Sequence, residues 1–566
     1  MSLPNPSTAF ASAVIDELAR GGVSLAVAAP GSRSTALVLA AEAHPAVELV
    51  MAIDERSAAF HALGGVKADG GPAAVITTSG TAVANLLPAV VEADMAGCPL
   101  VVLSADRPPE LRGVGANQAI DQGGLLGRSV RIALDLGPPE ARSDAPRYWR
   151  SSVSQVLGFS RGFSGRPGPV HLNLAFREPT VAVSDDGRSR DQPFPHPIAD
   201  RESGPWTDME TAKRPSPELV ERLAGEIAGS RRGMILAGAG LPAEPSIAAL
   251  GRKVGWPVLA TAESGLRGEE GVVASAHHLA GRVEGDLIVR FGSPGPSRRI
   301  VDLVSGRSRQ IVVASTWSDP GREAELVVDA EAGALADALL QAVDEREPDE
   351  WGHWWGEADR AVQTALAPEL ERGVITEPAM AWAAGRSRAD VLTVASSMPI
   401  RDVEAFAFVV PPIVANRGAS GIDGLVSTAL GAARHARSPL ALTGDISLLH
   451  DANGFLMEPR PDCVFLVADN AGGGIFSFLP QREHADASFE RLFATPPRRD
   501  LRLLAEFHHL QMHEVDSVSN LEKALDAARE GGSHLIVGRT DRDQNVAEHA
   551  RLNRLAGEAI SAVPLP

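Results

Sequence analysis

The chain has 566 residues, 44% of them hydrophobic and 22% charged, which is a globular composition and a length too great for one hydrophobic core. Its formal net charge of −19 excludes a protein that holds nucleic acid through a general positive surface. With two cysteines and no apolar stretch of ~18–20 residues, it lacks the means for a disulfide framework, a cysteine-rich metal site or a membrane span, and we expect it in the cytoplasm.

The first part of the chain alternates short apolar runs of strand length with stretches that carry small and apolar residues at helical spacing. The runs occupy residues 24–30, 73–80, 99–108 and 168–175, and the helical stretches occupy 36–43, 57–66 and 82–93. Nearly continuous apolar strands are typical of a parallel sheet covered by helices on both faces. Residues 1–180 therefore predict a doubly wound α/β domain.

Two segments without this alternation divide the chain. Residues 181–214 are rich in Pro, Asp, Ser and Arg and predict a linker. Residues 346–369 are charged and predict a second linker, in which Trp351, Trp354 and Trp355 form one helical stripe that is more typical of packing than of binding. The strand pattern returns at 440–445 and 463–470. The sequence thus predicts three α/β domains with parallel sheets, at 1–180, 215–345 and 370–566.

The last domain contains candidate ligands for a divalent cation. Asp445 follows one predicted strand and opens a helix, and Asn470 follows another strand 25 residues later, just before a Gly-rich turn at Gly472. A carboxylate, an amide oxygen and a backbone carbonyl form a hard oxygen site that suits Mg²⁺ or Ca²⁺ beside a phosphate. The helix after Asp445 also directs free N–H groups at such a phosphate. The alternative is that both residues only form turns.

This spacing resembles the diphosphate-binding motif of the thiamine-diphosphate-dependent enzymes, although Ile446 replaces a glycine and Asp469 replaces an asparagine of its strictest form. A second resemblance lies in the first domain. Glu55 ends a short apolar strand and occupies the position of the family's cofactor-activating glutamate, and residues 77–94 match the segment that contacts the pyrimidine. The resemblance implies three doubly wound domains, pyrimidine-binding, central and diphosphate-binding, with thiamine diphosphate and Mg²⁺ (or Mn²⁺) as cofactors.

The family resemblance also implies residue roles at the cofactor. Glu55 would be catalytic, because a carboxyl group bonded to N1′ of the aminopyrimidine favours the imino tautomer that removes the thiazolium proton. Ile422 would hold the cofactor in its bent shape. The cofactor-binding residues implied are Glu55, Thr81, Ser397, Ile422, Asp445, Ile446, Ser447 and Asn470, and the metal ligands implied are Asp445, Asn470 and Gly472.

Further phrases closely resemble the carboligases (transferases) of menaquinone biosynthesis within this family. They lie at residues 29–34, 104–111, 115–118, 397–402, 416–424 and 474–480. The resemblance implies decarboxylation of 2-oxoglutarate and 1,4-addition of the resulting carbanion equivalent to isochorismate, with release of CO₂. The arginines in these phrases fit such substrates on chemical grounds as well. Two dicarboxylate substrates present several carboxylates, and guanidinium groups bind carboxylates bidentately.

The substrate-binding residues implied are Ser32, Arg33, Arg107, Asn117, Gln118, Arg298, Ser397, Arg401, Arg417, Ile475, Phe476 and Leu479. Ile475, Phe476 and Leu479 would form an apolar wall that limits water. Arg298 lies in the central domain, where the resemblance is loose, and a solvated Arg298-Arg299 pair is the alternative there.

Two other functions stay open at this point. One is another carboligase or decarboxylase of the same family, such as an acetolactate-synthase-like enzyme that uses pyruvate. The other is a cofactor-binding regulator that has lost catalysis. Since Glu55 and Asp445 lie in separate domains, the family arrangement also implies a homodimer or homotetramer with the active site across the subunit interface.

Overall fold

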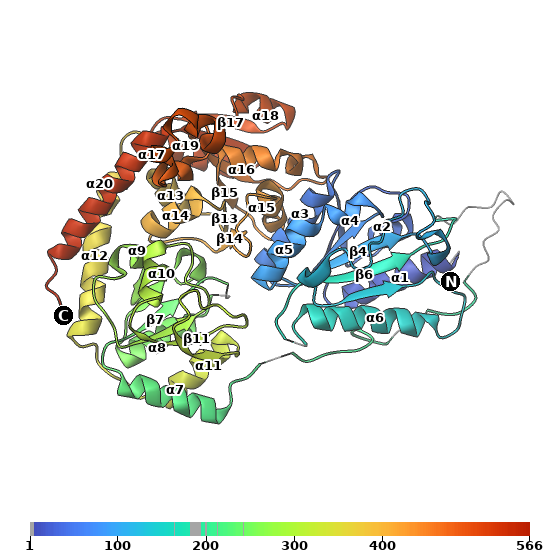
Figure 1. Ribbon diagram of the computed structural model, residues 1–566, viewed down its shortest axis with the longest axis horizontal. Coiled ribbons are helices and arrows are strands. Elements are labelled where there is room, and N and C mark those ends of the chain that lie inside the picture. The colour runs from blue at the N-terminus through green and yellow to red at the C-terminus, as the bar shows by residue number, and fades with distance from the viewer. Residues whose placement is uncertain (1–4, 164, 181–193, 199–200, 212, 241–242) are drawn as a thin grey trace. The chain divides into compact units, whose positions relative to one another are not determined.

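The computed structural model describes every residue of the chain except 1–4, 164, 181–193, 199–200, 212 and 241–242. Its strands form three parallel six-stranded sheets (Figure 1), so the predicted α/β class is confirmed. The chain divides into two compact units. Unit 1 comprises Met1–Thr211, Asn416–Ala436 and Leu449–Pro461, and unit 2 comprises Ala212–Ala415, Arg437–Leu448 and Asp462–Pro566.

Unit 1 contains a sheet of order β2-β1-β3-β4-β6-β5 with parallel neighbours throughout. Its strands are β1 (Leu25–Ala28), β2 (Glu48–Met51), β3 (Ala73–Thr77), β4 (Leu100–Asp106), β5 (Ala133–Leu136) and β6 (Val170–Ala175). The chain runs outward in opposite directions from β1 and β3, and α/β sheets bind ligands at the carboxyl edge of such a switch point. Arg33 follows β1, Thr81 follows β3 and Arg107 follows β4, so these predicted site residues share that edge.

Helices cover both faces of this sheet. They are α1 (Pro6–Arg20), α2 (Thr35–Glu42), α3 (Glu55–Asp69), α4 (Thr81–Ala84), α5 (Leu87–Ala96) and α6 (Ala145–Ser160). A further helix of unit 1, α15 (Leu425–Ala433), packs on α3. In Figure 1, α1 and α6 lie on one face and α3 and α5 on the other. The stretch 82–93, predicted as one helix, is two short helices, because Pro88 in the first turn of α5 has no N–H with which to continue α4.

Two helices of unit 1 touch backbone to backbone. A Cβ atom on Gly64 of α3 would lie 2.1 Å from the carbonyl oxygen of Thr428 in α15. A Cβ atom on Gly431 of α15 would lie 2.0 Å from the carbonyl oxygen of His61 in α3. Only glycine fits at these crossings. The contact therefore holds the helix that begins at Glu55 against the helix that follows residues 416–424.

Unit 2 contains the other two sheets. One has the order β12-β11-β10-β7-β8-β9 and the other β14-β13-β15-β16-β18-β17, which repeats the strand order of unit 1. The strands are β7 (Gly233–Ala237), β8 (Val258–Ala260), β9 (Val272–Val273), β10 (Leu287–Phe291), β11 (Arg309–Val313), β12 (Ala324–Val328), β13 (Val391–Val394), β14 (Ile413–Ala415), β15 (Pro439–Gly444), β16 (Val464–Asp469), β17 (Gln511–Val515) and β18 (His534–Arg539). Asp445 and Asn470 directly follow β15 and β16, which are neighbours.

The remaining α-helices are α7 (Pro217–Gly229), α8 (Pro245–Val254), α9 (Ala276–Leu279), α10 (Arg298–Val304), α11 (Ala332–Ala342), α12 (Glu350–Leu370), α13 (Glu377–Arg386), α14 (Met398–Phe406), α16 (Asp445–His450), α17 (Gln481–His484), α18 (Leu501–Phe507), α19 (Val518–Ala527) and α20 (Arg542–Ser561). None of the helices that the structure describes is long and apolar enough to cross a membrane. Residues 346–369, predicted as a linker, contain α12, which lies beside α20 (Figure 1). Its Trp351, Trp354 and Trp355 are buried in a core shared with Leu552 of α20, as their helical stripe predicts. The predicted linker at 181–214 lies partly outside the described residues.

Candidate active site

A cavity of about 400 Å³ lies at the carboxyl edge of the sheet in unit 1. It is lined by Ser32, Arg33, Thr78, Arg107, Leu111, Ala116, Asn117, Gln118 and Glu178. Five of the residues predicted to bind substrate therefore meet here although they come from three separate segments. The loop after β1 comes very close to β3 at this point, because a Cβ atom on Gly31 would lie 2.3 Å from Cβ of Thr78.

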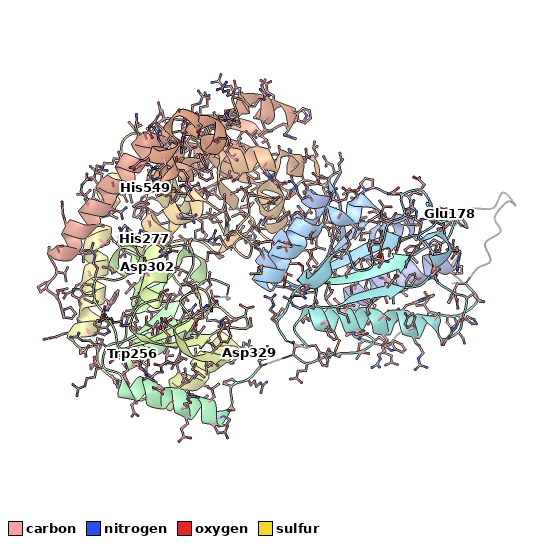
Figure 2. All side chains as sticks on the ribbon, viewed as in Figure 1. Glu178, Trp256, His277, Asp302, Asp329 and His549 are labelled. Atoms are coloured by element: carbon pink, nitrogen blue, oxygen red, sulfur yellow. The ribbon has the colours of Figure 1, made fainter. Side chains whose placement is uncertain are left out.

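The two arginines of this cavity are both buried. Arg33 donates to the carbonyl oxygen of Phe176 (2.9 Å) and pairs with Glu178, labelled in Figure 2 (Nη2 to Oε1, 2.7 Å). Its Nε is buried without a hydrogen-bond partner. Arg107 donates from Nη1 to the hydroxyl of Ser79. Burial, followed by the neighbouring charge of Arg33, lowers the pKa of Arg107. Two guanidinium groups brought together in a cavity are suited to an anion with more than one carboxylate.

Ser79, Asp106 and Asn173, which the sequence analysis did not name, help to hold this cavity in shape. Gln118 donates to the carbonyl oxygen of Ser79 (2.8 Å), and the Ser79 hydroxyl donates back to that of Gln118 (2.9 Å). Buried Asp106 accepts from the backbone N–H of Arg107 (2.7 Å) and from Asn173 (2.9 Å). Asp106 lies within residues 104–111, one of the segments that carry the family resemblance, but only the pairing of β4 with β6 reveals Asn173 as its partner.

Glu55 is the first residue of α3 and is half-buried. Asn85 donates a hydrogen bond to its carboxylate (Nδ2 to Oε2, 3.3 Å), while the neighbouring Asp54 caps the helix by accepting from the N–H of Arg56. Thr81 is exposed at the start of α4. The start of α3 also reaches the loop 416–424, because the guanidinium group of Arg56 lies 3.7 Å from the carboxylate of Asp423.

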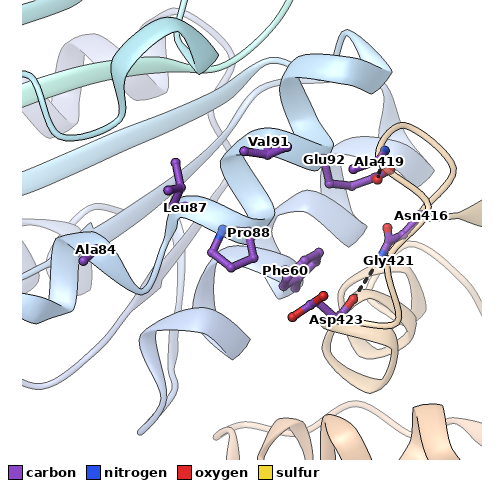
Figure 3. Close-up of a pocket in the computed structure, with 10 residues that line it drawn as sticks. All are labelled: Phe60, Ala84, Leu87, Pro88, Val91, Glu92, Asn416, Ala419, Gly421 and Asp423. Carbon is purple, nitrogen blue, oxygen red and sulfur yellow. Dashed lines mark hydrogen bonds between the residues drawn. The ribbon is translucent and has the colours of Figure 1, made fainter. Parts of the chain in front are cut away.

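The loop 416–424 lines a second cavity of unit 1, of about 470 Å³ (Figure 3). Phe60 and the α4–α5 region form its other side, and its lining residues are Phe60, Ala84, Leu87, Pro88, Val91, Glu92, Asn416, Ala419, Gly421 and Asp423. Arg417 and Ile422, both predicted site residues, are half-buried in this loop. The structure therefore places Ile422 in a loop whose neighbouring Asp423 contacts the start of α3, the helix that begins at Glu55.

In unit 2, the predicted cation ligands lie at the carboxyl ends of two adjacent strands. Both oxygens of the Asp445 carboxylate and Oδ1 of Asn470 are buried, and none makes a hydrogen bond of good geometry. Burial, and then the nearby charge of Asp469, raises the pKa of Asp445 to about 7, although backbone N–H groups partly offset this. Buried oxygens without partners are rare in proteins and fit a bound cation.

A residue that the sequence analysis missed orients Asn470. The Asn470 amide donates from Nδ2 to Oε1 of buried Glu377 (2.9 Å), which also accepts from the hydroxyl of Thr540 (3.0 Å). With its nitrogen held there, the amide oxygen is the atom left to bind a cation. Gly472 has φ 141, and a Cβ atom on it would lie 2.3 Å from the carbonyl oxygen of Ala494, so only glycine fits this turn. Of the three predicted ligands only Asp445 has an acidic side chain, and among the described residues no group of three or more His, Cys, Asp or Glu side chains could hold a metal.

The other predicted residues of unit 2, apart from Arg298, fall into three places. Ser397 precedes α14 with an unusual φ of 78, and Arg401 donates to its carbonyl oxygen (2.5 Å). Ile446 and Ser447 lie in the first turn of α16. Ile475 and Phe476 lie in a short 3₁₀ helix (Gly474–Phe478) after the glycine turn, and Leu479 follows it.

Arg298 stands apart from this group. It is 86% exposed and pairs with Asp302, labelled in Figure 2, within α10 (2.8 Å).

Three comparisons relate this chain to known proteins. A family model described as the N-terminal TPP-binding domain of thiamine pyrophosphate enzymes matches residues 8–125. A 2-succinyl-5-enolpyruvyl-6-hydroxy-3-cyclohexene-1-carboxylate synthase from Chloroflexus aurantiacus is 39% identical, over 98% of this chain and 97% of its own. The synthase of the same name from Thermobifida fusca is 40% identical over 99% of both chains. The crystal structure of benzoylformate decarboxylase from Polynucleobacter necessarius covers 94% of this chain and 98% of its own with a TM-score of 0.71; at 16% identity it shows a common fold.

Proposed function

The chain belongs to the family of 2-succinyl-5-enolpyruvyl-6-hydroxy-3-cyclohexene-1-carboxylate synthases, and we propose that it catalyses the reaction of that family in menaquinone biosynthesis. It would decarboxylate 2-oxoglutarate and join the remaining four-carbon unit to isochorismate by 1,4-addition, releasing CO₂. The observation that supports this most directly is the cavity that holds Arg33 and Arg107 together. A dicarboxylate offers a carboxylate to each of these guanidinium groups, whereas a monocarboxylate such as pyruvate, the substrate of the acetolactate-synthase-like alternative, offers one carboxylate for both.

We propose that Asp445, Asn470 and the carbonyl of Gly472 hold Mg²⁺ (or Mn²⁺), and that thiamine diphosphate binds there through its diphosphate. The three unpartnered oxygen atoms support this assignment. When bound, the thiazolium ring supplies the electron sink that decarboxylation of a 2-oxoacid needs. Glu55 would hold a proton at its carboxyl group against N1′ of the aminopyrimidine. Thr81, Ser397, Ile422, Ile446 and Ser447 would complete the cofactor site.

For the substrates, we propose that arginines bind the carboxylates and that an apolar wall limits water. Arg33 and Arg107 would bind substrate carboxylates in the first cavity. In the structure the Glu178 carboxylate forms an ion pair with Arg33, where a substrate carboxylate would bind. The other polar residues of the substrate site would be Ser32, Asn117, Gln118 and Ser397. Arg401 and Arg417 would be further carboxylate ligands. Ile475, Phe476 and Leu479 would form the apolar wall. Arg298 is the weakest member of the set, because its exposed pair with Asp302 explains its position without a substrate.

We also propose a cytoplasmic homodimer or homotetramer with each active site across a subunit interface. The separation of Glu55 and Asp445 between units 1 and 2 is compatible with this arrangement, and light scattering on the purified protein tests it. The domain boundaries that we propose are 1–180, 215–345 and 370–566, one for each parallel sheet.

The experiment that tests the function mixes the purified protein with Mg²⁺, thiamine diphosphate, 2-oxoglutarate and freshly prepared isochorismate. We expect isochorismate to disappear only when all components are present, with a product of the adduct mass less CO₂. If a parallel assay with pyruvate in place of 2-oxoglutarate consumes its 2-oxoacid and the first assay does not, the acetolactate-synthase-like alternative is correct. If no 2-oxoacid is consumed although the cofactor is bound, the regulator without catalysis is correct.

Replacing Arg107 tests the assignment of the first cavity. Because hydrogen bonds to charged groups contribute ~1.5–3 kcal/mol, Arg107→Met should lower kcat/KM for a dicarboxylate substrate by ~10- to 100-fold. Steady-state kinetics with each substrate varied in turn would measure this. Arg142→Met is the matched control, since Arg142 is exposed and pairs with Asp144 in the same domain. Equal kinetics for the two variants would contradict a role for Arg107.

Replacing Asp445 tests the cation site with a readout other than activity. In metal-free protein, Asp445→Asn should raise Tm or leave it unchanged, because the substitution removes a buried charge that has no partner. The rise in Tm on adding Mg²⁺ and thiamine diphosphate should be lost, since a ligand stabilises only a protein that binds it. Thermal melts of the wild type and of Asp445→Asn, each with and without Mg²⁺ and thiamine diphosphate, test this assignment. An undiminished rise in the variant would contradict the assignment.

A further inference from the structure

The loop 416–424 is held against α5 by a buried carboxylate. Glu92 lies in α5 with its side chain 3% exposed. Its Oε1 accepts from the backbone N–H of Gly418 (2.9 Å) and its Oε2 from that of Ala419 (2.6 Å). Figure 3 shows Glu92 directed at Ala419 along the edge of the cavity. One side chain therefore binds two consecutive N–H groups of the loop.

A lysine completes this contact. Nζ of Lys67 in α3 lies 2.8 Å from Oε1 of Glu92 and donates to Oδ1 of Asn416 (3.1 Å). Asn416 in turn donates from Nδ2 to the hydroxyl of Thr428 (3.0 Å) and to the carbonyl oxygen of Asp423 (3.4 Å, dashed in Figure 3). The cluster thus holds the loop at its beginning, in its middle and near its end.

The loop has no room to move closer to α5. A Cβ atom on Gly418 would lie 2.7 Å from the carbonyl oxygen of Glu92 and 2.8 Å from the backbone nitrogen of Ala96, so the loop lies directly on the helix. Arg417 and Ile422 are the members of the loop with proposed roles at the substrate and the cofactor. Neither is bonded by Glu92 in these contacts, so Glu92 would act on both through the backbone between them.

We propose that Glu92, neutralised by Lys67, is a positioning residue that fixes the loop 416–424 and thereby presents Arg417 and Ile422. The proposal rests on the proposed function of those two residues. Its physical basis is that only an ionised carboxylate offers acceptors to both loop N–H groups and to an ammonium group at once. An amide of the same shape has one acceptor oxygen and would direct its own N–H₂ at one of these donors.

The test compares wild type with Glu92→Gln and with the double variant Lys67→Met/Glu92→Met. In Glu92→Gln, hydrogen exchange of residues 416–424 in the cofactor-free protein should be faster. Because small displacements of catalytic groups are costly, kcat/KM should fall by ~10- to 100-fold. Glu92→Gln should also lower Tm, because it leaves the charge of Lys67 buried without its carboxylate. In the double variant no unpaired charge is buried, so Tm should recover part of that loss. The loop should still exchange fast and kcat/KM should stay low.

The matched control is Asp390→Asn. The Asp390 carboxylate also binds two consecutive backbone N–H groups, those of Arg437 (2.7 Å) and Ser438 (3.0 Å), ahead of β15 in unit 2. Asp390→Asn should leave kcat/KM and the hydrogen exchange of residues 416–424 unchanged.

Two results overturn the proposal. One is Glu92→Gln with a lower Tm but wild-type kcat/KM and loop exchange, which would make Glu92 a stabilising residue only. The other is recovery of kcat/KM together with Tm in the double variant. If the wild type itself consumes no isochorismate, the proposed function fails, while the exchange measurement still tests how Glu92 holds the loop.

Discussion

Glu55→Gln should remove most of the turnover while leaving the protein folded and able to bind its cofactor. A positioned acid or base contributes ~10²- to 10⁴-fold to rate, so kcat should fall by that factor. The fold should persist, because the cap of α3 comes from Asp54 and the bond from Asn85 can be accepted equally by a glutamine oxygen. Steady-state kinetics, calorimetric titration with thiamine diphosphate and Mg²⁺, and a thermal melt give the three readouts.

The matched control for this experiment is Asp54→Asn, the same chemical change one residue earlier. Asparagine and aspartate are nearly equal as helix caps, so neither Tm nor kcat should change much. Full activity of Glu55→Gln would remove Glu55 from the mechanism. A loss of kcat shared equally by both variants would assign the effect to the start of α3 as a whole.

The largest effect on stability should come from a buried ion pair in unit 2. Arg267 and Glu404 are completely buried, with Nη2 and Oε1 2.7 Å apart. Arg267 also donates to the carbonyl oxygens of Ala260 (3.1 Å), Val403 (3.0 Å), Ala407 (2.6 Å) and Glu404 itself (2.9 Å), so every N–H of the guanidinium is used. The connection between β8 and β9, which carries Arg267, thereby holds the last turn of α14, the helix that follows Ser397 and carries Arg401.

Arg267→Met should lower the free energy of unfolding by ~3–5 kcal/mol, because it leaves the Glu404 carboxylate buried without its cation. Burial already raises the pKa of Glu404. A folded-state pKa above the unfolded value means that the folded state takes up protons, so the penalty should be smaller near pH 5 than near pH 8. Urea unfolding followed by tryptophan fluorescence at both pH values measures this, with the buried α12 tryptophans as reporters.

Two further variants interpret that result. The double variant Arg267→Met/Glu404→Met should recover part of the stability, since no lone charge remains buried. Arg309→Met removes an exposed pair with Glu325 in the same unit and should cost less than about 1 kcal/mol. A similar small cost for Arg267→Met, independent of pH, would show that the Arg267–Glu404 pair does not stabilise the fold.

The local sequence pattern was sufficient to predict the fold class and to place two residues of the proposed diphosphate site at one edge of a sheet. The apolar runs at 440–445 and 463–470 form β15 and β16, and an apolar strand covered on both faces has few alternatives to a parallel sheet. Once these strands are parallel neighbours, Asp445 and Asn470 must lie at the same edge. The packing role of the three Trp residues of α12 could also be predicted, because helical spacing places them on one face of the helix.

Side-chain contacts between segments far apart in the sequence could not be predicted from the local pattern. Glu377 reaches Asn470, Asp106 reaches Asn173, and Glu92 reaches Gly418, each across at least 67 residues of sequence. Each is an ordinary acidic residue in its own segment, in a strand or a helix. Nothing local distinguishes it from the many acidic residues that face water.

The sequence by itself determined that this chain forms parallel α/β sheets, that it resembles the thiamine-diphosphate enzymes, and which polar residues end its strands. These properties depend on periodicity and on short motifs, which neighbouring residues carry together. Only the tertiary structure decided which arginines share a cavity, which buried oxygens lack a partner, and which carboxylates hold the loops that carry the proposed site residues. Those properties depend on burial and on the few ångströms between side chains, and both are set by how whole sheets and helices pack.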